Sequence, residues 1–374
     1  IYTSPADTFS ETLFSYRVSD GEYESAPATI ALQVVPAGTV IWQGGSSENF
    51  SDPANWIGGQ APGEGDRVWI APEGGGTVLV DTDASVDSIR VGGTGTDVTL
   101  KLNGRTLATS GGFEILPGST FQMANGTLDT GEDAVIRGHL DWDNGVHTGD
   151  AATIIADGAS ALIDQSAVYL RAGRDFINHG TVTQKGHGQL VADTADAITD
   201  ITNASGAQWT MDLHNGNRMV YPNNPTATLN LLNAGTLTKS SADLNYLGYS
   251  NGIFNLTHTG TIVVERGTLG FSNNANSVFS GPVDLAAGTT LWLPGGPTRF
   301  AGETPLPGEG LLSISGGTVT LSDDTTLSLL TLSGGTLVIP ESLRVETFAH
   351  QNGTLSGPGD VTVTGTLDWD NGVH

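Results

Sequence analysis

The sequence TFQMANGTLDTGEDAVIRGHLDWDNGVH at positions 120–147 returns without gaps as TFAHQNGTLSGPGDVTVTGTLDWDNGVH at positions 347–374. Of the 28 positions, 16 are identical, and the last eight, LDWDNGVH, are the same in both copies. Internal repetition of this kind is typical of architectures that stack one small structural unit many times. We therefore interpret the two copies as equivalent coils of a repeat structure, offset by 227 residues.

The shared octapeptide predicts a strand followed by a turn. Residues 140–143, Leu-Asp-Trp-Asp, alternate apolar and acidic side chains, so one pair should face the interior and the other solvent. Asn144 and Gly145 predict a turn with a positive φ, and Asn371 and Gly372 are their counterparts in the second copy. His147 is expected at this turn or on the surface. The duplication is therefore interpreted as a repeated corner and not as a copied active site.

From residue 73 onward, short strand-like pieces begin with Gly-Thr, followed by Leu, Val or Ile, as expected where the backbone turns at glycine and enters a strand. No segment keeps a 3.6-residue apolar period beyond about two turns. A propeller would need a regular blade of about 40–50 residues, and a sandwich of this length would need linkers. We predict an all-β, right-handed parallel β-helix over residues 73–374, with roughly 20–25 residues in each coil.

This repeated Gly-Thr-Leu pattern resembles the sequences of the right-handed parallel β-helices in haemagglutinin-like adhesins and autotransporter passengers. The resemblance implies the architecture and no particular activity.

Residues 1–36 predict a β-hairpin. Alternating runs at 14–18 and 30–34 flank a turn at Ser19-Asp20-Gly21, so the hairpin should have one buried face. The pattern F-x-Y-x-V-x-D-G resembles the last two strands of bacterial cadherin-like or immunoglobulin-like tandem modules. The earlier strands of such a module are absent, so we expect the chain to be part of a larger protein whose β-helix continues.

Residues 37–72 form a connector rich in glycine, proline and aromatic residues. Trp42, Phe50, Trp56 and Trp69 are expected to plug the open end of the β-structure; an exposed aromatic platform for sugars is the alternative. The string W-x-G-G…N-F-x-D-P-x-N-W…P-G-x-G-D-x-V-x-I is similar to the entry segment of β-helical regions in large bacterial surface proteins, which favours the cap.

Composition narrows the classes of function. The formal net charge is −26, and the 14 basic residues form no run, so a nucleic-acid partner is not expected. The absence of cysteine excludes disulfides and thiolate chemistry. No apolar run approaches the roughly 18–20 residues that span a bilayer, and the first residues do not resemble a signal peptide. We expect an extracellular or bacterial cell-surface protein without membrane insertion in this region.

Several aspartates offer oxygen ligands for Ca²⁺, although no EF-hand or nonapeptide calcium motif is present. The candidate ligands are Asp20, Asp81, Asp83, Asp141 and Asp143, with Asp87, Asp193 and Asp196 as further carboxylates. Calcium is a candidate ligand, and no cofactor is expected to be required.

Parallel β-helices also include polysaccharide-cleaving enzymes, among them pectin lyases and polygalacturonases. Polygalacturonases combine Asn-Thr-Asp, Asp-Asp and Gly-His-Gly; here Gly186-His187-Gly188 precedes Asp323-Asp324 and Asn-Thr-Asp is missing, so these residues should lie several coils apart. Lys185, Arg171 or Arg174 could serve as a lyase base. Ice binding would need Thr-x-Thr at one place in successive coils, and the spacing of such pairs is irregular.

We therefore predict a non-enzymatic structural or adhesive β-solenoid: a stalk, adhesin or matrix component. Its expected partners are further copies of itself, associated head to tail or along strand edges, or cell-surface glycans. The alternative is a polysaccharide lyase or hydrolase on the same fold.

Overall fold

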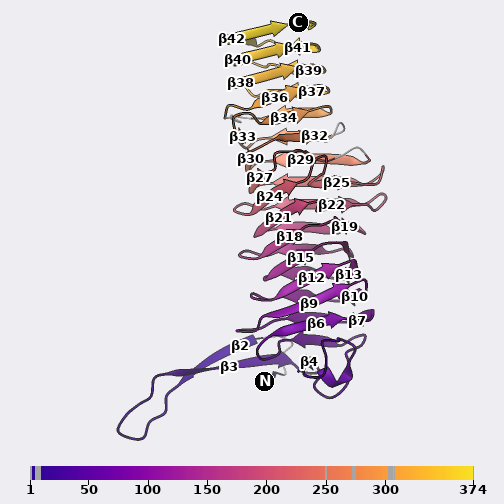
Figure 1. The fold of residues 1–374 in the computed structure, drawn as a ribbon, viewed down its shortest axis with the longest axis vertical. Coiled ribbons are helices and arrows are strands. Elements are labelled where there is room, and N and C mark those ends of the chain that lie inside the picture. The colour runs from indigo at the N-terminus through magenta and orange to yellow at the C-terminus, as the bar shows by residue number, and fades with distance from the viewer. Residues whose placement is uncertain are drawn as a thin grey trace.

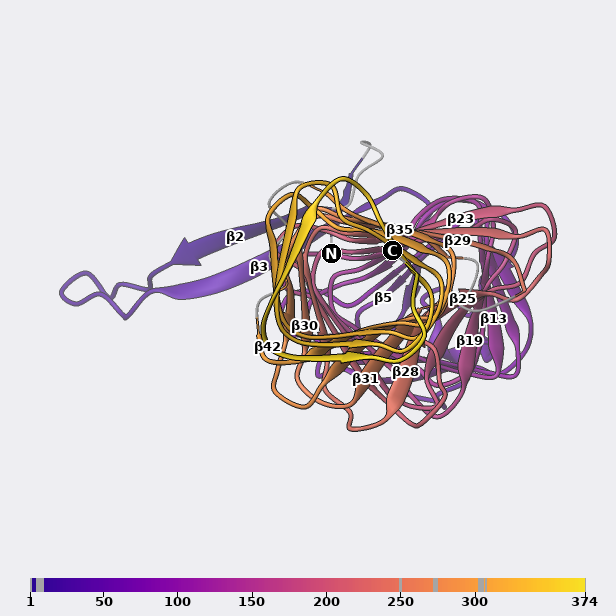
Figure 2. The same cartoon turned by 90° about the horizontal axis from the view of Figure 1, so that it is seen from above.

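The structure is a computed structural model that describes residues 2–4, 10–248, 251–271, 275–301, 306 and 308–373. These residues form strands β1–β42 and one 3₁₀ turn, η1 (Pro53–Asn55). The strands from β4 onward stack coil upon coil along a common axis, as Figure 1 shows from the side and Figure 2 from above. The predicted all-β parallel β-helix is confirmed.

One sheet, the long sheet, runs the length of the solenoid with fifteen strands in parallel register. Its strands, in spatial order, are β4 (Val40–Trp42), β5 (Arg67–Ile70), β8 (Ser88–Val91), β11 (Phe113–Ile115), β14 (Ala134–Ile136), β17 (Ala152–Ile155), β20 (Asp175–Asn178), β23 (Ile198–Asn203), β26 (Thr228–Asn233), β29 (Ile253–His258), β32 (Ala275–Phe279), β35 (Pro297–Phe300), β37 (Thr318–Thr320), β39 (Thr336–Val338) and β41 (Thr354–Ser356).

The second sheet has ten parallel strands. They are β6 (Gly76–Val80), β9 (Val98–Asn103), β12 (Thr120–Ala124), β15 (His139–Trp142), β18 (Ser160–Ile163), β21 (Thr181–Gly186), β24 (Gln208–Leu213), β27 (Thr236–Lys239), β30 (Thr261–Val264) and β33 (Val283–Leu285).

The third face is made by two seven-stranded sheets, joined by a parallel bridge between Arg218 and Tyr246. The N-terminal one contains β7 (Ala84–Val86), β10 (Thr106–Thr109), β13 (Gly126–Thr130), β16 (Gly145–Thr148), β19 (Ala167–Leu170), β22 (Gln189–Ala192) and β25 (Val220–Pro222). The C-terminal one contains β28 (Leu244–Leu247), β31 (Thr268–Phe271), β34 (Thr290–Leu293), β36 (Leu311–Ile314), β38 (Thr325–Leu332), β40 (Ser342–His350) and β42 (Asp360–Trp369).

The core is a set of columns of like residues. In β12, Phe121 and Met123 face inward and pair in register with Leu100 and Leu102 of the coil before. Coil length varies, because cross-coil partners are 18 residues apart at Asp324 and Ser342 but 30 apart at Asn203 and Asn233. Loops absorb this variation, so the strands stay in register.

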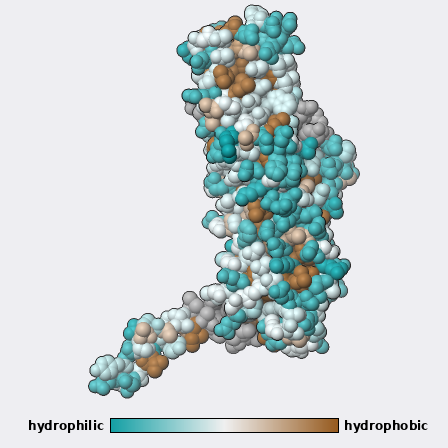
Figure 3. Space-filling view, in the orientation of Figure 1, coloured by the Kyte–Doolittle hydropathy of each residue, from teal (hydrophilic) through white to brown (hydrophobic). Residues whose placement is uncertain are grey.

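The hairpin lies apart from this stack. β2 (Ser10–Tyr16) and β3 (Ala28–Pro36) are antiparallel, β1 (Tyr2–Ser4) joins β3 in parallel, and the β2–β3 arm projects from the base of the solenoid (Figure 1). The prediction of a buried face is wrong where the side chains are described: Phe14 is 52% exposed and Ile30, its cross-strand partner, is 54% exposed. Apolar side chains are visible along this arm in Figure 3. Within the described residues no second sheet covers it.

The repeated peptide occurs on two different faces. In the first copy Leu-Asp-Trp lies in β15 of the second sheet, and Gly145 begins β16 of the third face. In the second copy Leu-Asp-Trp ends β42 of the third face, and Val373 bridges Thr354 of the long sheet. The prediction that the second copy is an equivalent coil is therefore wrong in one respect: its strand and turn lie on a different face of the solenoid from those of the first copy. A strand and tight turn of this length fit at either corner.

The local packing of the turn is nevertheless reproduced. Met123 pairs with Trp142 in the first copy, and His350 pairs with Trp369 in the second. A Cβ on Gly145, which has a φ of +120°, would lie 2.7 Å from the Met123 side chain; one on Gly372 would overlap the His350 ring. A Cβ on Gly145 would also lie 2.4 Å from the backbone oxygen of Gly126, so both turns need glycine. The predicted positive φ is confirmed at Gly145 and wrong at Gly372, whose φ lies outside the left-handed region. His374 lies outside the described residues.

Candidate functional site

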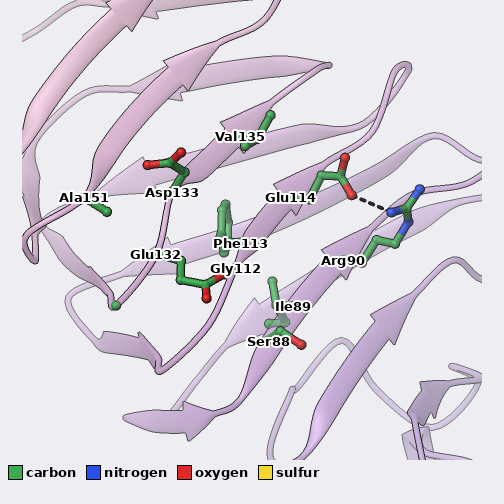
Figure 4. Close-up of a pocket in the computed structure, with 11 residues that line it drawn as sticks. Ser88, Ile89, Arg90, Gly112, Phe113, Glu114, Glu132, Asp133, Val135 and Ala151 are labelled. Carbon is green, nitrogen blue, oxygen red and sulfur yellow. Dashed lines mark hydrogen bonds and ion pairs between the residues drawn. The ribbon is translucent and has the colours of Figure 1, made fainter. Parts of the chain in front are cut away.

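A groove of about 590 Å³ lies over the amino ends of β8, β11 and β14, which belong to three successive coils of the long sheet. Figure 4 shows Arg90 and Glu114 on neighbouring strands, with Glu132 and Asp133 on the turn before β14. Its lining is mixed, because Val135 contributes apolar surface between these polar groups, whereas the Phe113 ring is buried in the core against Phe121. The groove can therefore hold a polar, extended ligand such as a sugar chain.

Glu114 is fixed at the wall of this groove by two arginines. Its Oε2 lies 2.5 Å from Nη1 of Arg90, and its Oε1 lies 2.8 Å from Nε of Arg137. Asp133 is also engaged, since its Oδ1 accepts a hydrogen bond from the backbone N–H of Ala152 at 3.0 Å. Both oxygens of the Glu114 carboxylate are therefore already paired with guanidinium groups.

Three of the predicted calcium ligands have local structural partners. Asp20 accepts the backbone N–H groups of Glu22 and Tyr23 at the hairpin tip, and these bonds lower the pKa of its carboxyl. Asp81 accepts the N–H and hydroxyl of Ser51 at 3.0 and 2.6 Å, which ties the connector to the first coil. Asp83 accepts the N–H of Thr106 in the next coil.

Asp141 lies in β15, and Asp143 is the first residue of the turn that follows it. Asp141 accepts a hydrogen bond from Gln122 of the preceding coil, and partial burial together with the charges of Asp141 and Asp164 raises the pKa of Asp143. Across the described residues, no three His, Asp or Glu side chains are arranged to hold a metal ion. Calcium binding stays a prediction.

The residues considered for hydrolase chemistry lie far apart. Gly186-His187-Gly188 follows β21, whereas Asp323-Asp324 precedes β38, and β24, β27, β30 and β33 of the second sheet lie between them along the stack. Asp324 accepts a hydrogen bond from the hydroxyl of Ser342 at 2.7 Å. The two motifs do not share a site.

The proposed lyase bases have different surroundings. Arg171 makes a bidentate ion pair with Asp193, which raises the pKa of its guanidinium. Arg174 is fully buried and donates to Thr153 Oγ1, Thr148 O and Ala152 O, and burial lowers its pKa to about 10. Lys185 is exposed, and its partner in the next coil, at the same position in register, is Asp212.

His147 is buried in the core, so the expectation of a turn or surface position is wrong. Its ring stacks on Trp142, and its Nδ1 lies 2.9 Å from Thr153 Oγ1, the hydroxyl that also accepts from Arg174. Burial and the Arg174 charge lower the pKa of His147 well below 6.5. Sequence patterns did not predict this cluster, because Arg174 comes from the coil after the one that holds Trp142, His147 and Thr153.

A second buried polar feature is a ladder of amides at the end of the long sheet's strands. Asn178 Nδ2 donates to Asn203 Oδ1, Asn203 Nδ2 to Asn233 Oδ1, and Asn233 Nδ2 lies 3.0 Å from His258 Nδ1. His258 Nε2 lies 3.1 Å from Pro282 O. The sequence pattern that marks this ladder is Asn-x-Gly-Thr, which begins at positions 178 and 233. His258-Thr259-Gly260-Thr261 has the same pattern with histidine in place of asparagine.

The outer surface of the second sheet carries hydroxyl groups in two columns. We name this surface the flank; its columns are Thr181, Gln208, Thr236 and Thr261, and Thr183, Thr210, Thr238 and Val263. Complete Thr-x-Thr pairs occur on the first and third of these four coils, at Thr181 and Thr183 and at Thr236 and Thr238, and not on successive coils. On the long sheet, Asn255, Asn230 and Asp200 form a parallel hydrogen-bonded row.

The connector's aromatic side chains are buried at the N-terminal end of the stack. The rings of Trp42 and Phe50 each meet Trp56 edge to face with centroids 5.0 Å apart, and Trp56 Nε1 donates to Phe50 O. Trp69 Nε1 donates to Gly92 O at 3.0 Å. All four side chains are at most 4% exposed, which leaves little aromatic surface for a sugar platform.

No family model, no curated protein and no solved structure matches this chain. Within the described part of the chain, no helix has the length and apolar character needed to cross a bilayer.

Proposed function

We propose that this chain is a non-enzymatic structural and adhesive solenoid, a stalk or matrix component at a bacterial surface or outside the cell. The long sheet is the observation that carries this proposal, because its hydrogen bonds run without a break from β4 to β41. A continuous ladder of this kind makes an extended body that can hold a binding surface at a distance from its attachment.

The flank supports the adhesive part of the proposal. Each of its two columns spans four successive coils and carries three Thr hydroxyls, with Gln208 and Val263 at the remaining positions. A flat array of hydroxyl groups suits a repetitive, hydroxyl-rich partner such as a glycan. Association with further copies of the chain, and Ca²⁺ as a bridging ion on so acidic a surface, belong to the same proposal.

The groove over β8, β11 and β14 favours the alternative, a polysaccharide-active enzyme, since it has the size and polarity for a sugar chain. The chain should be incubated with pectate, alginate, cellulose and chitin, with and without Ca²⁺. Retention on a polysaccharide without new reducing ends or unsaturated products supports the adhesive function. Specific product release would overturn it and favour the enzyme.

A further inference from the structure

His187 and His214 lie side by side on the corner that follows the second sheet. His187 follows β21 and His214 follows β24, so the two side chains project from successive coils. His214 Nδ1 lies 3.3 Å from His187 Nε2, and the rings are nearly perpendicular, with centroids 4.7 Å apart. Both residues are exposed, so the pair is open to solvent.

We propose that these two nitrogens form a binding site for a divalent transition-metal ion of the zinc, nickel or copper type. Metal–nitrogen bonds to imidazole are about 2.0–2.1 Å long, so nitrogens 3.3 Å apart subtend an angle of about 107° at a shared ion. This is close to the tetrahedral angle. Two imidazoles suit these metals, whereas Ca²⁺ and Mg²⁺ prefer oxygen.

Asn217 is placed to orient the site. Its Nδ2 lies 2.8 Å from Gly186 O and 3.0 Å from His187 Nδ1, so without metal Nδ1 accepts a hydrogen bond and Nε2–H donates to His214. Metal binding needs the other neutral tautomer of His187, with the proton on Nδ1. Rotation of the Asn217 amide then offers Oδ1 to that proton, at the cost of the hydrogen bond from Nδ2 to Gly186 O. A metal-bound histidine commonly has such an outer partner.

A carboxylate lies near the pair. A Cβ on Gly186 would be 3.0 Å from Asp164 Oδ1 and 3.8 Å from His214 Cε1, so both side chains border the same glycine. Asp164 therefore adds negative charge in the neighbourhood of the His214 ring, which favours a cation there. Water completes the coordination, because the described residues contain no set of three ligands already in place.

Titration of the metal-free chain with Zn²⁺ and Ni²⁺, in excess Ca²⁺ to occupy carboxylate sites, tests this inference. We expect one strong site per chain, weakened at least about tenfold by His187→Gln or His214→Gln and abolished by the double variant. His179→Gln, which alters another exposed histidine, is the matched control and should leave the affinity unchanged.

Two further measurements distinguish a built site from loose surface binding. Co²⁺ should give the intense visible absorption of a tetrahedral site, and Asn217→Asp should tighten binding because a carboxylate accepts the Nδ1 proton more strongly. Unchanged affinity in the double variant, with circular dichroism showing that it is folded, would overturn the proposal. So would a control variant that weakens binding equally.

Discussion

The imidazole of His147 lies flat on the indole of Trp142 inside the solenoid, with ring centroids 3.9 Å apart and an interplanar angle of 17°. Both residues belong to the duplicated octapeptide, and the turn between them brings β15 and β16 onto adjacent faces. The peptide is therefore a packing unit: the turn lets one aromatic ring cover another within a single coil.

Stability should fall on mild acidification because of His147. Its folded-state pKa is well below 6.5, so the unfolded chain binds the proton first and the free energy of unfolding decreases as pH drops below about 6.5. The slope for one such group is at most about 1.4 kcal/mol per pH unit. Urea denaturation between pH 7.5 and 5 should show this decrease. His147→Phe should reduce the slope, whereas His179→Gln should not; equal slopes in all three proteins would disprove the assignment.

Lys239 should produce a rise of the same sign at alkaline pH. Its Nζ is buried against Ser241 O, Ser241 Oγ and Arg266 O, and burial lowers its pKa to about 8 from 10.5. Between these values the folded chain has lost a proton that the unfolded chain keeps, so stability rises with pH. The shift sets an upper limit of about 3 kcal/mol. Denaturation at pH 7.5 and 9.5 measures it, and Lys239→Met should remove the rise. A rise that persists in this variant would show that other groups cause it.

The buried amide ladder should contribute more to stability than the outer row. Asn203→Ala removes bonds to Asn178, Asn233 and Thr236 O, and we expect a loss of about 2–4 kcal/mol. The matched control, Asn230→Ala, acts on the outer row and should cost less than about 1 kcal/mol. Comparable losses in both variants, measured by urea denaturation, would contradict this account.

Trp56 should protect the first coils. Truncation to Ala empties the space between Trp42 and Phe50, and a change of this kind costs about 3–5 kcal/mol. Because a solenoid's coils contact only their neighbours, hydrogen exchange should accelerate in β5 and β6 and remain slow in β26 and β29. Uniform acceleration along the chain would show that the aromatic cluster is not a local cap.

The strands could be predicted from the sequence, because the alternation of apolar and polar side chains that marks a strand involves residues close together in the chain. Phe121 and Met123 could be placed inside from the pattern alone. Features that depend on coil length could not be predicted: the flank requires Thr183, Thr210 and Thr238 to align, although loops of different length separate them. His147 was misplaced because its polarity suggested solvent, while its stacking partner and hydroxyl partner become visible only in three dimensions.

The same reasoning applies to the pair His187 and His214. They are 27 residues apart, a separation that matches one coil only where the loop after β22 has its particular length. The hairpin face was misjudged for a different reason. Alternation shows which side of a strand is apolar, but it does not show whether another element covers that side, and Phe14 and Ile30 are exposed.

Retention on polysaccharides by variants of the flank and of the groove tests the central claim most directly. We predict that the double substitution Thr210→Lys and Thr238→Lys abolishes retention, that Thr290→Lys on the third face preserves it, and that Glu114→Gln in the groove preserves it. None of these proteins should release product. Product release by the unmodified chain that Glu114→Gln abolishes would contradict the adhesive account and identify the groove as an active site.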